Sequence, residues 1–166
     1  VYINQEARHG LWNYISAHFS MIDKVVGNNY TNEPMAFLLE DSEIQEEIEP
    51  YIMARIVDFE EFIRQYPFDI ISIHDDLHFI IDDPIMECNC GDFSLRWDAA
   101  GDTILERGGT RGETVRCDIQ TLTAMFYGYK RPTYLKRVER LQANDTAVRI
   151  LEDIIPIEQP YFSDYF

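Results

Sequence analysis

The chain has 166 residues and a mass of 19.5 kDa, which gives room for one ordinary domain or for one domain plus part of another. With 46% hydrophobic and 13% aromatic residues, the composition excludes a disordered or low-complexity protein. Lys and Arg number 14 against 30 Asp and Glu, and the net charge of -16 at pH 7 repels phosphate backbones and anionic lipid surfaces. We therefore expect no nucleic-acid partner and no membrane partner, whereas cationic or amine partners are compatible with this charge.

The cysteines and the start of the chain bear on its compartment and its completeness. Cys88, Cys90 and Cys117 are an odd, sparse set that cannot form a closed disulfide framework, which favours the reducing cytoplasm. No apolar run approaches the roughly 18 residues needed to span a bilayer, and the first residues lack the pattern of a signal peptide. Because the chain begins with Val1 and not with Met, we expect it to be part of a longer protein.

The start of the chain predicts helices and one short strand. Asn4 can cap a helix over residues 6–18, in which Leu11 and Ile15 lie one helical turn apart. Residues 21–26 are predicted to form a strand, and Pro34 in a first turn predicts a short helix that ends near residue 39.

An acidic, loop-like stretch over residues 40–50 predicts a domain boundary. It belongs to the more acidic half of the chain, since residues 1–83 carry a net charge of -13 and residues 84–166 carry -3. We therefore divide the chain into a segment of residues 1–48 and a domain of residues 49–166.

Beyond the boundary the sequence predicts a strand, a helix and then a change of period. Residues 51–57 are an apolar run of strand length, and Asp58 begins a helix that ends before Pro67. Further on, apolar residues at 93, 95 and 97 alternate with polar ones, which is typical of a half-buried strand.

Three neighbouring runs are the predicted partners of that strand: 77–81, 103–107 and 114–117. The connections 98–102 and 108–112 are short enough for hairpins. They favour an antiparallel sheet.

Three helices are predicted after the sheet. Asp118 caps the first, which ends near Gly128, while Thr133 opens the second and Asp145 the third. Strands grouped before helices indicate an α+β fold, with a mainly antiparallel sheet covered by helices.

Two patterns could carry chemistry but are better explained otherwise. Residues 107–112 read RGGTRG, yet a phosphate-binding loop leads from a strand into a helix, whereas this run lies between two predicted strands and is interpreted as a turn. The spacing of the histidines and cysteines is poor for zinc, so we expect no metal site and no catalytic cysteine among His74, His78, Cys88, Cys90 and Cys117.

Charged residues are predicted to be solvated. The acidic pairs at 75–76 and 82–83 bracket a strand and are expected at its solvated ends. A solvated helix face is expected for the five bases that follow the first of the late helices: Lys130, Arg131, Lys136, Arg137 and Arg140.

The end of the chain is unusually apolar. Its last six residues contain four aromatic side chains, after a stretch stiffened by Pro156 and Pro160. A loose tail is seldom so apolar, so we expect it to dock. Docking would place the α-carboxylate of Phe166 in a partly desolvated site, where it could accept a proton. The alternative is that the aromatic residues only fasten the terminus to the core.

Five short runs occur in a recognisable order. They are ARHGLWN at 7–13, NEP at 32–34, YIMARIVD at 51–58, FYGYKRP at 126–132 and PYFSDYF at 160–166. Together they resemble the C-terminal part of the Eis-like (enhanced intracellular survival) GNAT-family N-acetyltransferases of low-GC Gram-positive bacteria. The resemblance covers essentially the whole chain.

The resemblance implies a domain plan. Members of that family have an N-terminal GNAT domain that binds acetyl-CoA, a second GNAT-like domain and a C-terminal domain like sterol carrier protein, and they assemble as hexamers. Residues 1–48 would then be a partial α/β remnant, the end of the second GNAT-like domain. Residues 49–166 would be the sterol-carrier-protein-like domain.

The resemblance also implies one site residue. In the family, the carboxylate of the last residue helps to deprotonate the substrate amine, which makes Phe166 the catalytic candidate here. Acetyl-CoA would be bound by the missing N-terminal domain, because the loop R/Q-x-x-G-x-G/A does not occur in this chain. We therefore expect no cofactor-binding residue and no activity in this chain by itself.

Three functions remain open. The chain is first interpreted as the substrate-side and assembly region of an acetyl-CoA-dependent N-acetyltransferase, with a polyamine, aminoglycoside or lysine as amine substrate and with its own N-terminal GNAT domains and further copies as partners. The second is a carrier that binds an apolar ligand beside Leu122, Met125 and Phe126, although such residues are more often plain core. The third is a purely structural oligomerisation domain.

Overall fold

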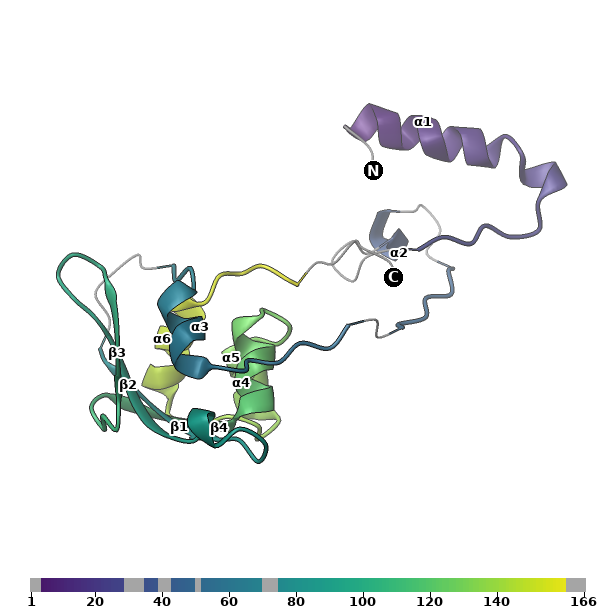
Figure 1. Ribbon diagram of the computed structural model, residues 1–166. Helices are drawn as coiled ribbons and strands as arrows, with labels where there is room; N and C mark the ends of the chain where they lie inside the picture. The colour runs from purple at the N-terminus through teal and green to yellow at the C-terminus, as the bar shows by residue number, and fades with distance from the viewer. Residues whose placement is uncertain (1–3, 29–34, 39–42, 50–51, 70–74, 161–166) are drawn as a thin grey trace. The chain divides into compact units, whose positions relative to one another are not determined.

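The computed structural model describes residues 4–28, 35–38, 43–49, 52–69 and 75–160 (Figure 1). The chain forms two compact units, Val1–Glu49 and Pro50–Phe166, and each is described by itself.

The first unit is helical and exposed. Helix α1, Gln5–Ser16, begins at Asn4, whose side-chain oxygen accepts a hydrogen bond of 2.8 Å from the backbone N–H of Ala7, as the sequence predicts. A 3₁₀ turn η1, Phe19–Met21, and the short helix α2, Met35–Leu38, follow. None of the residues described in this unit is buried.

One strand predicted in this unit is wrong. Residues 22–28 contain no strand, and Val26 is 78% exposed. A strand needs a neighbour for its backbone N–H and C=O groups, and these residues have no such neighbour among those described.

The second unit is built on a sheet of five strands in the order β3-β2-β1-β4-β5. The strands are β1 Leu77–Asp82, β2 Gly91–Trp97, β3 Thr103–Arg107, β4 Glu113–Asp118 and β5 Gln142–Ala143. Strand β1 pairs antiparallel with β2 and parallel with β4, and the other two pairings are antiparallel. The sheet is therefore mixed but mainly antiparallel.

Four helices cover one face of this sheet (Figure 1). They are α3 Phe59–Gln65, α4 Ile119–Phe126, α5 Pro132–Arg137 and α6 Asp145–Ile154. A 3₁₀ turn η2, Glu87–Asn89, lies in the connection between β1 and β2. The predicted α+β class is confirmed.

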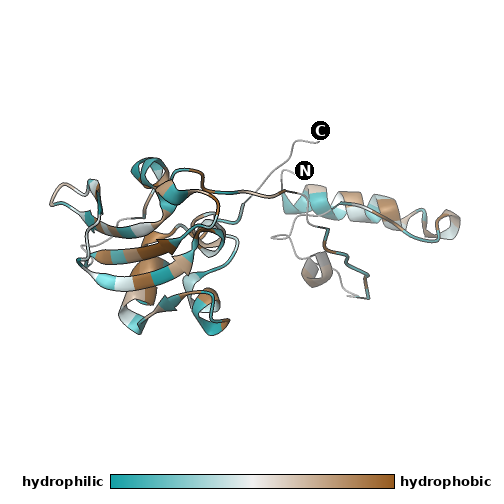
Figure 2. Cartoon of the chain, turned by 60° about the horizontal axis from the view of Figure 1, so that its bottom comes forward, coloured by the Kyte–Doolittle hydropathy of each residue, from teal (hydrophilic) through white to brown (hydrophobic). Residues whose placement is uncertain are grey.

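The core lies between the sheet and these helices. Apolar and polar residues are mixed along the strands (Figure 2) and alternate along β2 and β4, and the side chains of Phe79, Phe93 and Val115 are fully buried. Phe59 of α3 meets Phe79 and Phe93 edge to face, with ring centroids 5.8 Å and 5.0 Å apart. Such pairs prefer edge contacts because of the ring quadrupole.

Side-chain caps set the starts of three helices in this unit. Asp58 accepts from the N–H of Glu61 at 2.9 Å, and Asp118 accepts from Thr121 at 2.7 Å, as predicted. The cap of α6 is Asn144, which accepts from Ala147 at 2.8 Å, and not Asp145 as the sequence indicated. Each cap satisfies a backbone N–H that has no partner within its helix.

The strand predicted over residues 51–57 is also wrong. Residues 52–56 are extended without pairing to the sheet, because side chains bind their backbone. The N–H of Ile56 donates to Thr123 Oγ1 at 3.2 Å, and Val57 O accepts from Asn89 Nδ2 at 3.3 Å.

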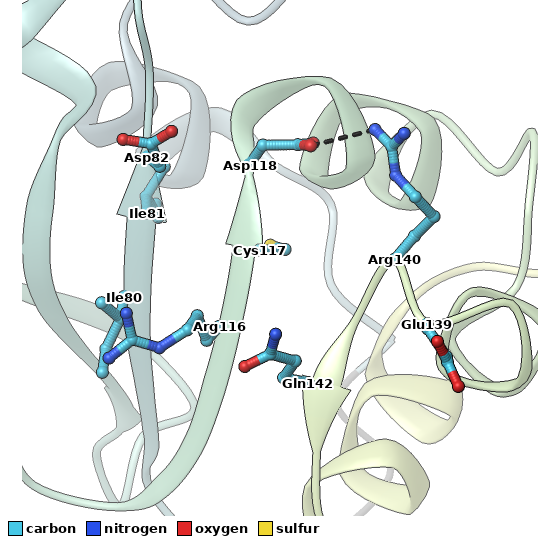
Figure 3. Close-up of a pocket in the computed structure, with 9 residues that line it drawn as sticks. All are labelled: Ile80, Ile81, Asp82, Arg116, Cys117, Asp118, Glu139, Arg140 and Gln142. Atoms are coloured by element: carbon cyan, nitrogen blue, oxygen red, sulfur yellow. Dashed lines mark hydrogen bonds and ion pairs between the residues drawn. The ribbon is translucent and has the colours of Figure 1, made fainter.

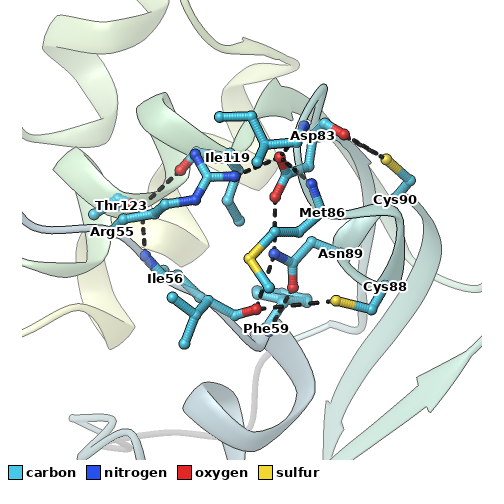
Figure 4. Close-up of polar contacts among 12 residues, drawn as sticks. Arg55, Ile56, Phe59, Asp83, Met86, Cys88, Asn89, Cys90, Ile119 and Thr123 are labelled. Carbon is cyan, nitrogen blue, oxygen red and sulfur yellow. Dashed lines mark hydrogen bonds and ion pairs between the residues drawn. The ribbon is translucent and has the colours of Figure 1, made fainter.

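This segment is joined to the β1–β2 connection by the carboxylate of Asp83 (Figure 4). Arg55 Nη2 donates to Asp83 Oδ1 at 2.5 Å, and Asn89 Nδ2 donates to Oδ2 at 2.8 Å. The N–H groups of Ile85 and Met86 both donate to Oδ1 at 3.0 Å. Asn89 Oδ1 in turn accepts from the N–H of Phe59 at 2.9 Å, so one buried polar network spans both segments.

The network keeps Asp83 ionised. Burial raises the pKa of this carboxyl, but the hydrogen bonds from Asn89, from the backbone of Ile85 and Met86 and from Arg55 outweigh burial and hold the pKa well below its usual range.

The connection from β3 to β4 crosses the face of the sheet that lies opposite the helices. In the sheet, β2 and β1 lie between β3 and β4. Residues 108–112 therefore do not form the predicted hairpin. Ser94 Oγ of β2 accepts from the N–H of Arg111 at 2.8 Å and donates to its carbonyl at 2.7 Å. The crossover then reaches Asp76, where Gly112 has a φ of 109°. The glycine-rich run thus connects two strands, as interpreted, and its glycines allow close backbone approach.

Gly112→Ala should destabilise the protein by more than the cost of placing an alanine in a left-handed backbone conformation. A Cβ at this position would lie 2.2 Å from the backbone oxygen of Asp76, which would have to move. Gly91→Ala is the matched control, because its φ is 122° and a Cβ there meets nothing within 4 Å. We expect the control to cost about 1–3 kcal/mol of unfolding free energy and Gly112→Ala to cost clearly more, measured by urea unfolding. Equal losses would contradict the crossover geometry.

The stability of the protein should fall on acidification through Asp83. Its pKa is lower in the folded state, so the unfolded state takes up the proton first, and stability decreases as pH falls below about 4. Asp83→Asn should lower the free energy of unfolding by about 1–3 kcal/mol at neutral pH. It should also weaken the loss of stability on acidification. Asp82→Asn, at the exposed neighbour, is the control and should change neither. Thermal melts from acidic to neutral pH test this, and an unchanged pH dependence in Asp83→Asn would refute it.

Candidate functional site

The histidines and cysteines that the structure describes do not gather into one site. His74 lies outside the described residues. His78 is buried with Nε2 2.7 Å from Asp92 Oδ1, Cys88 is exposed, and the thiol of Cys90 donates to the carbonyl of Asp83 at 3.2 Å. Within the described part of the chain, no three His, Cys, Asp or Glu side chains are placed to hold a metal ion.

Cys117 is a core residue, as its spacing indicated. Burial, and secondarily the charge of Asp118, raises the pKa of its thiol to about 12. The thiol therefore stays protonated at physiological pH and is no nucleophile.

The acidic pairs are also separate. Asp75 and Asp82 are exposed, and Asp76 Oδ2 lies 2.6 Å from Arg111 Nε. Asp83 is only 4% exposed, so its prediction as a solvated strand end is wrong. Its carboxylate is buried and accepts four hydrogen bonds in the network described above, so we assign it no part in acid or base chemistry.

A polar hollow of about 510 Å³ opens beside β1, β4 and β5 (Figure 3). Arg116, Asp82 and Glu139 contribute charges to it, while Arg140 donates to Asp118 at 2.9 Å. Its charges alternate in sign, so it selects no single class of charged ligand.

Glu139 in this hollow has a φ of 60° because it follows the end of α5. The N–H of Glu139 donates to Lys136 O at 3.0 Å and the N–H of Arg140 to Leu135 O at 2.9 Å, which is the Schellman pattern of helix termination. The left-handed backbone is thus explained by the helix end.

An apolar hollow of about 430 Å³ lies beneath the C-terminal segment. It is lined by Ile52, Ala54, Tyr66, Pro67, Phe126, Tyr127, Pro156, Glu158, Gln159 and Pro160. Of the three residues named for an apolar ligand, only Phe126 reaches it, because Leu122 and Met125 are fully buried in the core.

Tyr66 joins the wall of this hollow to the end of α4. Its hydroxyl donates to the carbonyl of Phe126 at 2.8 Å. Burial raises the pKa of Tyr66 to about 12, with Arg131 opposing and Asp69 adding to the shift. The phenol therefore stays protonated and keeps this hydrogen bond at physiological pH.

Of the five bases assigned to a solvated face, Arg131 is the clear exception. Its Nε donates to Glu152 Oε2 at 2.7 Å, its Nη2 to Glu152 O at 2.7 Å, and its Nη1 to the carbonyls of Ile155 and Pro156 at 2.9 Å and 3.1 Å. Burial raises the pKa of the Glu152 carboxyl, but hydrogen bonds from Thr133 and Arg131 outweigh it and lower the pKa.

The four other bases lie on the outside, two of them in ion pairs. Lys136 Nζ lies 2.6 Å from Asp145, and Arg140 lies 2.9 Å from Asp118. Lys130 and Arg137 lie over the ring of Tyr134. Sequence reasoning missed the role of Arg131. Three of its partners are backbone carbonyls, and the residue types at those positions do not reveal such contacts.

Phe166, the predicted catalytic residue, lies outside the described residues, and so do residues 161–165. The structure describes the segment that leads to them up to Pro160. Among the helices it describes, none has the length and apolar character needed to cross a membrane.

Two family models match the chain in succession. Residues 1–56 match the acetyltransferase (GNAT) domain, and residues 59–163 match the sterol carrier protein domain. No curated protein matches the chain.

Solved structures match nearly the whole chain. A probable N-acyltransferase of Enterococcus faecalis is 28% identical with a TM-score of 0.80, over 99% of this chain and 42% of that one. A GCN5-related N-acetyltransferase of Anabaena variabilis is 26% identical with a TM-score of 0.69, over 96% and 40%. Eis1 of Mycobacterium abscessus, 18% identical with a TM-score of 0.65 over 96% and 40%, shares the fold.

The chain thus spans about two fifths of the length of these structures. Because the sterol carrier protein model covers residues 59–163, well over half of the 166, the chain belongs to the sterol carrier protein domain family.

Proposed function

We propose that this chain is the C-terminal, substrate-side and assembly region of an Eis-like, acetyl-CoA-dependent N-acetyltransferase that acts on amines. The observation that carries the proposal is the match of 99% of the chain, at 28% identity and a TM-score of 0.80, to a probable N-acyltransferase. The succession of an acetyltransferase model and a sterol carrier model along the chain supports the same order of domains.

In this proposal residues 1–48 are the end of a GNAT-like domain and residues 49–166 are the sterol-carrier-like domain. The exposure of the first unit supports this division. Phe19, Met21, Val26 and Phe37 are each at least 76% exposed, and no residue described in that unit is buried. Isolated exposed apolar residues are ordinary, but a unit without any buried ones needs further protein to cover it.

Acetyl-CoA binds outside this chain in the intact enzyme. The chain spans 42% of the first matched structure, and the acetyl-CoA loop pattern is absent from its sequence. The cofactor site therefore belongs to an N-terminal GNAT domain of the longer protein, and none of the residues of this chain is assigned to it.

The acceptor is an amine of the polyamine, aminoglycoside or lysine type. The net charge of -16 attracts such cations. The α-carboxylate of Phe166 takes the proton from the amine, which must lose it to attack the acetyl carbonyl. The intact enzyme is a bacterial, cytoplasmic homo-oligomer, and a hexamer is the state we propose.

The packing of the core speaks against the carrier function. Leu122 and Met125 are fully buried among other core residues and line neither of the two hollows described above. The apolar hollow at Phe126 lies instead beside the C-terminal segment.

This chain by itself should show no CoA-dependent turnover. Without a site for acetyl-CoA, the amine has no activated acetyl group to attack. Release of free CoA from acetyl-CoA with spermine, kanamycin or a lysine peptide measures this, with the complete enzyme as positive control. Measurable turnover by the 166-residue chain would refute the proposed division of labour.

In the complete enzyme, removal of Phe166 should lower kcat/KM for the amine by about 100-fold or more, while the Kd of acetyl-CoA stays unchanged. Phe166→Leu is the matched control, because it keeps the carboxylate at the same position in the chain and should retain most activity. Extension by one glycine moves the carboxylate and should act like the removal. Full activity of the truncated or extended enzyme would overturn the role of the terminal carboxylate.

A further inference from the structure

We propose that the loop of residues 126–132, FYGYKRP, is a clamp that fixes the direction in which the C-terminal segment leaves the domain, with Arg131 and Gly128 as positioning residues for the carboxylate of Phe166. The clamp itself rests on described contacts, while its effect on catalysis rests on the proposed function. In the following, the exit segment is residues 155–160.

Arg131 binds the start of the exit segment directly. Its four hydrogen bonds, of 2.7 to 3.1 Å, reach the side chain and carbonyl of Glu152 and the carbonyls of Ile155 and Pro156. Only a planar guanidinium presents donors in so many directions at once. The last carbonyls of α6 and the first of the exit segment are therefore held by one side chain.

Gly128 makes room for the middle of the exit segment. Its φ is 70°, and a Cβ at this position would lie 1.9 Å from the carbonyl oxygen of Glu158. The chain can thus pass over the loop at Glu158 only because position 128 has no side chain.

The loop is anchored in the domain at its other contacts. Tyr66 Oη donates to Phe126 O at 2.8 Å, and the N–H of Lys130 donates to Ala124 O at 3.1 Å. The N–H of Thr133 donates to Glu152 Oε1 at 2.8 Å, which ties the same glutamate to the start of α5. The clamp is consequently fixed relative to the core.

Beyond Ile155, which is buried in the core, little else holds the exit segment. Residues 157–160 are exposed, Ile157 by 86%, and they make no hydrogen bond to any other residue that the structure describes. An apolar hollow of about 430 Å³ lies beneath them instead of packed core. The contacts of Arg131 and Gly128 are therefore what sets the course of the segment.

The course matters because of the chain that follows. Phe166 is the eighth residue after Glu158, and eight residues span at most roughly 27 Å. The position of Glu158 therefore limits the region that the Phe166 carboxylate can reach, and a proton acceptor must lie within hydrogen-bond reach of its amine.

The clamp is tested first in the 166-residue chain, without reference to activity. Backbone ¹⁵N relaxation gives order parameters for Ile157 and Gln159. The variant Arg131→Lys keeps the positive charge but loses the planar guanidinium that donates the four hydrogen bonds. We expect these order parameters to fall below about 0.6 in the variant, with the sheet unchanged. Arg137→Lys, at an exposed arginine two turns of chain away on α5, is the control and should leave them as in the wild type.

Gly128→Ala gives an independent arm. Its control is Gly108→Ala, since Gly108 has a φ of 76° but open space around a Cβ. Both variants carry similar backbone strain, so amide shifts of residues 157–159 that move only in Gly128→Ala report the displaced segment. Unchanged order parameters and shifts in both Arg131→Lys and Gly128→Ala would overturn the clamp.

The complete enzyme tests the link to catalysis. Arg131→Lys should lower kcat/KM for the amine about tenfold with the Kd of acetyl-CoA unchanged, and it should have no further effect in enzyme that already lacks Phe166. An equal loss in both backgrounds would refute the positioning role. A loosened segment with full activity in both Arg131→Lys and truncated enzyme would leave the clamp standing and overturn the terminal-carboxylate function instead.

Discussion

The carboxylate of Asp83 is the contact on which the sterol carrier unit depends. It accepts hydrogen bonds from Arg55 and Asn89 and from the two amides that follow it in the chain, so it joins the segment before α3 to the connection between β1 and β2. Asn89 in turn accepts a hydrogen bond from the N–H of Phe59, the first residue of α3. The ring of Phe59 packs against Phe79 and Phe93 in the core. A buried charge is costly unless it is fully paired. Here the pairing also decides where the chain enters the domain.

The sequence predicted the elements whose signals are local. Asn4, Asp58 and Asp118 cap their helices as expected, and the alternation of Phe93 and Leu95 with polar residues marks β2 correctly. The failures come from long-range partners. Residues 52–56 look like a strand, but the side chains that bind this segment belong to Thr123 and Asn89. No local pattern distinguishes a parallel partner for β1 from an antiparallel one, so the sequence predicts a hairpin at residues 108–112 where the structure has a crossover.

Long-range partners also explain why the roles of Arg131 and Gly128 could not be predicted from the sequence. Arg131 reads as one of five bases on a solvated face, since nothing in its neighbourhood reveals that α6 ends beside it. Gly128 reads as a helix terminator, and it is one, but the chain that crosses it is thirty residues further on. In both cases the residue type predicts the role within its own helix or turn. The second role, contact with the C-terminal segment, depends on the three-dimensional packing. Phe166 itself remains a prediction from resemblance.

The apolar hollow beneath the exit segment has a consequence for how this fold is inherited. Its walls include Ile52 and Ala54, where the chain comes in, and residues 156–160, where it goes out. The segment that enters the sterol carrier unit and the last described residues of the chain therefore lie on one side of that unit. Units whose two ends are close together can be inserted, exchanged or deleted without rebuilding the host around a new path of the chain. This geometry makes the unit suited to insertion into, or exchange between, longer proteins.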